Sequence, residues 1–374
     1  MKKLVAFCLV IIMSVSLLNG CGSSAQDTSA ATNTTVSTTT NTTADTAANV
    51  ETGTVVWSLT NSASSANTAF GDAYQYAQEQ QPAGSSIQIE LYDNGVLGGD
   101  LETLEGVRNG QINIHCGDFS AIASSVPVAA IFSVPFLFTH DRTASWAGAE
   151  FLDILNEELH QQNLHVLGVP STGLRNLSCN FAIYSPEEIK GLKLRIMENE
   201  YHAAFWGALG AQATPLAWGE VYIALQQGML DAEENSIAIM TAAKMAEVQS
   251  YYIYTKHLPQ YCALICNWDA YQSLSETQRT ELDAYMDNLS TQFVNRVGER
   301  EELIVQELLD DYGTTFIEFT DEQIAEMRTQ TSDLVVGMLK EKMPEYSDLI
   351  NQWLKIAEEA EANKEAILAG TYEN

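Results

Sequence analysis

The sequence predicts an α/β protein whose folded part consists of two similar lobes. A strand–helix–strand alternation opens the folded part, which is typical of a parallel sheet. A pattern of helix, glycine stop and strand then occurs twice, at residues 102–112 and 220–230. The chain has 374 residues, of which 46% are hydrophobic, so it exceeds one typical domain.

The N-terminus predicts an export signal. A lysine pair precedes an apolar run, residues 4–17, that is too short to span a bilayer. The run ends in LNGC, which is similar to the lipobox of bacterial lipoproteins. We therefore expect residues 1–20 to be a signal peptide and Cys21 to carry lipid. Ordinary cleavage nearby is the alternative. Residues 21–53, rich in Ser, Thr and Ala, predict a flexible tether. The folded part is thus expected outside the cytoplasm, anchored to the cell membrane by lipid.

The charge balance excludes several kinds of partner. The chain carries 49 acidic and 18 basic residues, a formal net charge of −31. Nucleic acid and anionic membrane surfaces are poor partners, because binding phosphate needs a basic patch. We expect no nucleic-acid binding, and arginines near a cleft stand out against the negative field.

The elements of the first lobe can be read in order from hydrophobic periodicity. Phe70, Ala73, Tyr74 and Ala77 share one face of the first helix, and Asn109-Gly110 ends the second. The predicted elements are a strand at 55–59, a helix at 68–80, a strand at 87–91, a helix ending at 108, and strands at 112–115 and 164–170.

The second lobe repeats the alternation and leads into a long helix. Ser275 and Gln278 form a capping box that opens this helix, which continues to about Tyr312. A helix of that length usually spans two packing partners. The predicted elements are strands at 181–183 and 192–196, helices at 201–209 and 218–227, strands at 230–232 and 261–267, the long helix, a strand at 314–319, and helices from Thr320.

The strand at 192–196 carries two basic side chains on one face. Leu192, Leu194 and Ile196 alternate with Lys193 and Arg195, so a strand directs the aliphatic side chains into a core and the basic pair the other way. This pattern predicts that the two basic side chains contact an anion. A solvated surface charge is the alternative for each.

Four further cysteines follow the lipobox: Cys116, Cys179, Cys262 and Cys266. Their spacing fits neither a zinc pattern nor a redox C-x-x-C pair. We expect small buried hydrophobic side chains here, with a disulfide as the alternative.

Several long, ordered motifs resemble the extracytoplasmic solute receptors of tripartite ATP-independent periplasmic (TRAP) transporters, of the dicarboxylate-receptor-like kind. They lie between about Val55 and Glu359 and include GVLGGDLETLEGVRNGQINI, PFLF, GLRNLSCNFAIYSPEEIKGLKLRI, ALGAQATPLAWGEVYIALQQGMLDAEEN and YTKH. The resemblance implies a two-lobed fold like the type II periplasmic binding proteins, with hinge strands and a long helix bridging the lobes. The lobes it implies are residues 54–173 with 262–305, and residues 174–261 with 306–372.

The resemblance also implies a ligand site. Arg195 matches the family arginine that clamps a carboxylate, for which a guanidinium offers two parallel N–H bonds; Lys193 has no such match and is expected to be solvated. The other implied contacts are Arg175, Trp218, Asn235, His257, Glu198, Asn199, Asp100 and Asn61. A structural role is the alternative for Arg175, Trp218, Asn235 and His257.

This sequence departs from the family pattern near the site. Leu101 replaces a common arginine, and Ala232 and Ser236 replace a frequent glycine and proline. A glutamate at position 198 disfavours a second ligand carboxylate nearby.

The function that the resemblance implies is that of a receptor, which captures a small organic acid and delivers it to TRAP permease subunits.

 The motifs typical of enzymes, such as G-x-S-x-G, H-E-x-x-H and a Gly-rich phosphate loop, do not occur in the sequence, so we expect no catalysis, no cofactor and no metal. A lipoprotein serving an ABC importer or a sensory system is the alternative, and an extracytoplasmic enzyme is a remote one. We expect a monomer. The family binds C4-dicarboxylates, sugar acids, keto acids and aromatic acids on the same arginine, so the sequence leaves the acid open.

Overall fold

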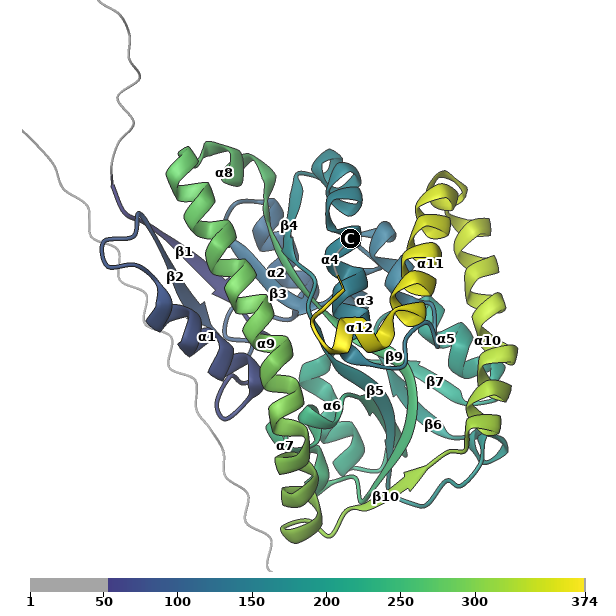
Figure 1. Ribbon diagram of the computed structural model, residues 1–374. Coiled ribbons are helices and arrows are strands. Elements are labelled where there is room, and N and C mark those ends of the chain that lie inside the picture. Colours follow the sequence, from purple (N-terminus) through teal and green to yellow (C-terminus); the bar gives the residue numbers. More distant parts are fainter. Residues whose placement is uncertain (1–52, 373–374) are drawn as a thin grey trace, which may run out of the picture. The chain divides into compact units, whose positions relative to one another are not determined.

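The computed structural model describes residues 53–372. The expected signal peptide, Cys21 and nearly all of the expected tether lie outside the described residues. Strands in the described part follow the order β2-β1-β3-β9-β5-β8-β6-β7, with β4 and β10 also paired to β9. The helices lie on both sides of these strands (Figure 1). None of the helices in residues 53–372 is long and apolar enough to cross a membrane.

The first group of strands confirms the predicted parallel sheet. β1 pairs in parallel with both β2 and β3, as the strand–helix–strand alternation requires. The strands are β1 (Val55–Thr60), β2 (Ile87–Tyr92), β3 (Ile114–Asp118) and β4 (Leu164–Gly168). The helices of this part of the chain are α1 (Ala69–Gln80), α2 (Asp100–Arg108), α3 (Phe119–Ile122) and α4 (Asp141–Leu159).

The second group repeats this arrangement. β6 pairs in parallel with β7 and β8, and β5 pairs antiparallel with β8. The strands are β5 (Ser171–Cys179), β6 (Lys193–Ile196), β7 (Gln212–Pro215), β8 (Ala232–Asn235) and β10 (Thr315–Glu318). The helices are α5 (Glu200–Ala208), α6 (Trp218–Gln226) and α7 (Ile237–Ala242).

The repeated glycine stop has the same conformation in both lobes. Gly110 follows α2 with φ +70°, and Gly228 follows α6 with φ +67°. A side chain is disfavoured in this left-handed region, so glycine ends each helix and turns the chain toward the next strand.

One long strand, β9 (Tyr251–Asn267), joins the two groups. Residues 251–254 pair with β10, and residues 251–261 pair with β5. Residues 262–266 pair with β3, and β4 pairs with the same end of the strand. β9 therefore passes from one sheet to the other and is the hinge strand that the resemblance implied.

The helix α9 (Glu276–Asp310) follows α8 (Trp268–Ser273) and confirms the predicted capping box of Ser275 and Gln278. It packs against α1 and also against α7 (Figure 1). Its N-terminal half contributes Leu282 to the core with β1 and α1. Its C-terminal half contributes Leu308 to the core with α6 and α7. The helix thus bridges the two lobes as expected.

The C-terminal helices divide their contacts between the lobes. α10 (Asp321–Lys342) packs against α5, whereas α11 (Ser347–Ala362) and α12 (Lys364–Leu368) pack against α4. The expected second lobe, which ran to residue 372, therefore ends in helices that lie against the first. The short 3-10 helices are η1 (Pro127–Ser133), η2 (His160–Gln162), η3 (Pro186–Ile189), η4 (Met245–Glu247) and η5 (Pro344–Tyr346).

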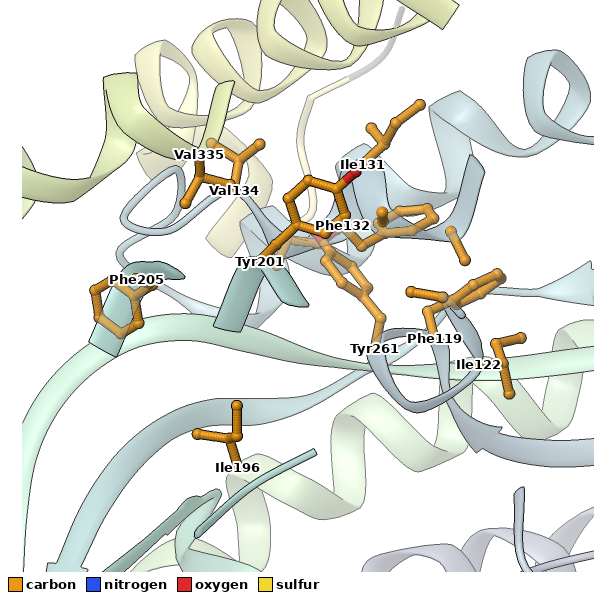
Figure 2. Close-up of a cluster of buried hydrophobic side chains, with 14 of the residues drawn as sticks. Phe119, Ile122, Ile131, Phe132, Val134, Ile196, Tyr201, Phe205, Tyr261 and Val335 are labelled. Atoms are coloured by element: carbon orange, nitrogen blue, oxygen red, sulfur yellow. The ribbon is translucent and has the colours of Figure 1, made fainter. Parts of the chain in front are cut away.

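Aromatic side chains fill the largest core cluster. Figure 2 shows Phe132 and Tyr261 within this cluster. The ring centroid of Phe132 lies 4.9 Å from that of Tyr261 and 4.9 Å from that of Trp353. These residues come from η1, β9 and α11, so the core fixes the end of the hinge strand against elements far away in sequence. Pairs in this range contribute about 0.5–1.5 kcal/mol beyond the burial of their area.

Two predicted strands, at residues 181–183 and 261–267, differ from the structure. Residues 181–183 form no strand: Phe181 is exposed and Ile183 is buried in a loop. The strand lies earlier, in β5, whose polar sequence STGLRNLSC hides the alternation because its buried face carries charged and polar groups. For the same reason β9 begins ten residues before the predicted position 261.

Candidate functional site

A cavity of about 810 Å³ lies where the ends of several strands meet, and both lobes line it. Such a volume suits a small ligand. Seven of the predicted contacts lie in its wall: Asn61, Asp100, Arg175, Arg195, Glu198, Trp218 and Asn235. These side chains come from α2, β5, β6, α6 and β8, and from the segments that directly follow β1 and β6.

Arg195 is the central cation of this wall. It lies on β6, and its side chain is 3% exposed. Its Nε and Nη2 donate to the carbonyl oxygen of Leu216, at 3.0 and 2.8 Å. Among residues 53–372 no carboxylate lies within 4.0 Å of the guanidinium, and Nη1 has no hydrogen-bond partner. Burial is the largest influence on its pKa and lowers it. Lys193, on the same strand, is exposed as expected.

The segment after β7 holds this guanidinium in place. Its backbone folds over the end of β6, where Leu216 N donates to Ile196 O at 3.1 Å. This contact directs the Leu216 carbonyl toward Arg195. Trp218 opens α6 two residues later, and the Arg195 guanidinium carbon lies 5.7 Å from the centroid of its ring. A cation over an aromatic face is attracted by about 0.5–1 kcal/mol when exposed, and more when desolvated.

Arg175 has a very different environment, although it also lines the cavity. Its Nε donates to Glu234 Oε2 at 2.6 Å, and its Nη2 donates to Glu234 Oε1 at 3.0 Å. Its Nη1 donates to Asp118 Oδ2 and to Asn235 Oδ1, each at 3.3 Å. The guanidinium is therefore neutralised inside the protein, and one of its partners, Asp118, belongs to the other sheet.

Glu234 is the centre of this network. Burial alone would raise its pKa, but Arg175 and hydrogen bonds from neighbouring histidines hold the pKa well below the usual range. His257 Nε2 lies 2.9 Å from Glu234 Oε2, and its Nδ1 lies 2.8 Å from Thr255 Oγ1. Burial lowers the pKa of His257, which is neutral at physiological pH.

Two expected ligand contacts do not reach the cavity. His257 is absent from its wall, because both ring nitrogens are held by Glu234 and Thr255. Asn199 is also absent. Its Oδ1 caps α5, and its Nδ2 donates to Ser120 O and Ser133 Oγ. Both residues support the site from behind.

Acidic groups also line the wall. Asp100, at the first position of α2, has a pKa raised to about 6 by burial and by the charge of Asp118. Glu198 is exposed at the exit of β6. Behind Arg195, burial raises the pKa of Glu233 to about 7, although both arginines lower it.

The four cysteines among the described residues, at positions 116, 179, 262 and 266, are buried and free, as expected. Cys116 and Cys262 line the cavity, and their Sγ atoms are 3.1 Å apart. The hydrogen bond to Cys116 and burial raise the pKa of the Cys262 thiol well above its usual value. Residues 53–372 contain no cluster of His, Cys, Asp and Glu side chains that could hold a metal ion.

Several residues of the site were missed by sequence reasoning. Asp118 is the last residue of β3, and a polar residue at the carboxyl end of a parallel strand is a signal that could have indicated it. Glu233 and Glu234 are adjacent in a four-residue strand and both buried. Two buried acids imply nearby cations, but Arg175, the partner of Glu234, is distant in sequence.

Comparison with known proteins identifies the family of this chain. Residues 59–342 match the family described as bacterial extracellular solute-binding protein, family 7 (DctP). A solute-binding protein of Chromohalobacter salexigens is 30% identical over 198 residues, which are 52% of this chain and 58% of that protein. The ectoine-binding periplasmic protein TeaA of Halomonas elongata is 27% identical over 317 residues, 78% of this chain and 92% of that protein.

Solved structures share the fold. The sugar acid binding protein DctPAm of Advenella mimigardefordensis, in complex with galactonate, has a TM-score of 0.75 at 22% identity. The match covers 82% of this chain and 99% of that one. The periplasmic ectoine-binding protein of the Halomonas elongata TeaABC TRAP transporter has a TM-score of 0.73 at 24% identity, covering 81% and 99%. The chain therefore has the two-lobed α/β fold predicted from its sequence, and it belongs to family 7 of the bacterial extracellular solute-binding proteins, the TRAP receptor family that its motifs resemble.

Proposed function

We propose that this protein is a TRAP solute receptor that captures a small organic acid by pairing the acid's carboxylate with Arg195. The observation that carries the proposal is the guanidinium itself, which is buried in the wall of the cavity and lacks an ion-pair partner among the described residues. Its Nη1 and the second N–H of Nη2 are free to donate to a carboxylate.

The energetics favour an anionic ligand. A buried charge without a partner costs several kcal/mol in lost solvation, and an incoming carboxylate offsets that cost with charge-assisted hydrogen bonds. A dissociation constant of about 1 μM corresponds to about −8 kcal/mol. One bidentate pair, contact with Trp218 and a few further hydrogen bonds can supply this amount.

Closure of the lobes would complete the site. The proposed lobes are residues 54–173 with 262–305, and residues 174–261 with 306–372. The last helices of the second, α11 and α12, lie against α4 of the first. The cavity receives residues from both, so a ligand in contact with both favours the closed form. The β9 strand and the α9 helix are the elements that bend.

Family membership supports the proposed partners and location. The receptor would hand its ligand to TRAP permease subunits, with no chemical change to the ligand. Its relatives are solute-binding proteins, which supports a role without catalysis. The lipid anchor at Cys21 would keep the receptor at the outer face of the cell membrane.

A thermal-shift panel tests the proposal. Dicarboxylates, sugar acids, keto acids and amino acids are added to the wild type and to Arg195→Met, with neutral sugars as the ligand control. An acid at about 100 times its dissociation constant should stabilise the wild type by about 2.7 kcal/mol. The shift should vanish in Arg195→Met and persist in Lys193→Met, which removes an exposed charge from the same strand. A shift that survives in Arg195→Met would refute the carboxylate clamp.

A further inference from the structure

The charged side chains that line the cavity are unevenly paired. The arginines are Arg175 and Arg195, and Arg175 is already neutralised by Glu234 and Asp118. The remaining carboxylates of the wall, Asp100, Glu102, Glu198 and Glu220, form no ion pair with any described residue. Once a ligand carboxylate occupies Arg195, the cavity retains an excess of negative charge.

Asp100 is the deepest of these unpaired acids. Its Oδ1 is shielded from solvent and accepts no hydrogen bond from any described residue. Glu102, Glu198 and Glu220 are exposed, so water solvates them. Oδ1 lies against Gly117 of β3, whereas the Asp100 side chain as a whole is partly exposed and lines the cavity. A carboxylate without a counter-charge in such surroundings is costly, and a cation that reaches its accessible side would relieve that cost.

The backbone of β3 is shaped to receive the Asp100 carboxylate. A Cβ on Gly117 would lie 2.2 Å from Asp100 Oδ1, so only the bare glycine lets the carboxylate approach this strand. Arg195 is near enough to lower the pKa of Asp100, and Glu198 is near enough to raise it. The two ends of the cavity, one cationic and one anionic, therefore face the same space.

We propose that the ligand is a zwitterionic acid, whose carboxylate pairs with Arg195 and whose cationic N–H group pairs with Asp100. The inference rests on the proposed function and narrows its ligand class. A dicarboxylate would place its second charge beside Asp100 and Glu198, where repulsion opposes binding. A hydroxyl would supply a donor but would leave the negative charge of Asp100 uncompensated.

The apolar wall fits the body of such a ligand. Phe70, Phe293 and Met197 contribute to it between the charged groups, together with the Trp218 ring. Methylenes or a ring joining the two charges would pack on these side chains, and the charged ends would fix the orientation.

Matched probes test the ligand class. Four linear acids share a three-methylene chain and differ at the far end: 4-aminobutanoate, 4-hydroxybutanoate, pentanoate and glutarate. Proline and cyclopentanecarboxylate provide a ring pair, and the aminoacids and diacids with one to five methylenes extend the linear set. Thermal shift and calorimetry on the full chain at pH 7.5 should give larger effects for the amino acids than for their matched partners, and the smallest for the diacids.

Asp100→Asn should lower the affinity for the best amino acid by about tenfold or more, because a neutral amide replaces the counter-charge. Glu105→Gln is the matched control, since it removes an exposed charge of α2 that lies outside the cavity wall. It should leave that affinity unchanged. No response to any amino acid, a larger response to a hydroxy acid or diacid, or full affinity in Asp100→Asn would overturn the inference.

The same measurements separate this inference from the proposed function. If a diacid or hydroxy acid binds and Arg195→Met abolishes its binding, the clamp stands and only the ligand class is wrong. If an amino acid binds equally well to Arg195→Met, the clamp itself is wrong.

Discussion

Arg175 and Arg195 both lie buried in the wall of one cavity, yet their surroundings differ. Arg175 donates to Glu234, Asp118 and Asn235, so every nitrogen of its guanidinium has a partner. Arg195 donates only to the carbonyl of Leu216. The difference teaches that burial alone does not mark a binding arginine. We infer that the arginine that binds an anion is the one whose buried guanidinium lacks an ion-pair partner inside the protein.

The two arginines therefore have different roles in the site. Arg175 connects β5 to β8 and, through Asp118, to the end of β3 in the other sheet. It therefore stabilises the frame of the site. Arg195 leaves donors unused and is available to an anion from outside.

The largest expected effect on stability comes from Arg175→Met. Removing this guanidinium leaves Glu234 buried without its main counter-charge, so the free energy of unfolding should fall by about 3–5 kcal/mol. Urea unfolding followed by circular dichroism measures this loss. A variant as stable as the wild type would show that the network is not structural.

Arg195→Met should not destabilise the protein without ligand. The side chain makes no ion pair with a described residue, so replacing it with a methionine should leave the free energy of unfolding unchanged or raise it. The same urea titration checks this. A loss comparable to that of Arg175→Met would erase the distinction between the two arginines.

Glu233→Gln should change how the free energy of unfolding depends on pH, which tests the electrostatic surroundings of the two arginines. Burial raises the pKa of Glu233 to about 7, so the folded protein binds this proton more tightly than the unfolded chain does. The wild-type side chain therefore destabilises the fold increasingly as pH rises from about 4.5 to 7. Glu233→Gln should be more stable than the wild type at pH 8, by on the order of 1–3 kcal/mol, and should lose this advantage near pH 4.5.

Melting temperatures of the two proteins across this range give the measurement. An advantage that does not change with pH would mean that Glu233 does not titrate between the folded and unfolded states as inferred.

The smallest effect is expected at Trp218. Its ring lies 5.7 Å from the Arg195 guanidinium carbon and contributes about 0.5–1 kcal/mol by attraction to the cation. Trp218→Leu should weaken binding of the acid about two- to fivefold, and Trp218→Phe should weaken it less. Calorimetry with the acid identified in the panel compares them. Equal affinities in all three proteins would remove the ring from the site.

Much of the fold could be predicted from the sequence because local patterns encode it. The capping box at Ser275 and the glycine stops at 110 and 228 use interactions among neighbouring residues, which are visible in the letters. The β5 strand and the first part of β9 were missed. Their polar side chains are buried through partners far away in the chain, and no local period reports such pairing.

Most residues of the site could be predicted from the sequence, but the hydrogen-bond and ion-pair partners of these residues could not. Seven of the nine predicted contacts lie in the wall of the cavity. The sequence left open whether Arg175 binds a ligand or supports the site, because its partners Asp118 and Glu234 are more than 50 residues away. His257 and Asn199 carry the right chemistry, but hydrogen bonds inside the protein occupy them.

The most direct test of the central claim is calorimetric titration of one acid, the best in the panel, into three proteins. The account predicts that Lys193→Met binds like the wild type and that Arg195→Met binds at least about a hundredfold more weakly, because it lacks the charged hydrogen-bond donors. Wild-type affinity in Arg195→Met would contradict the account.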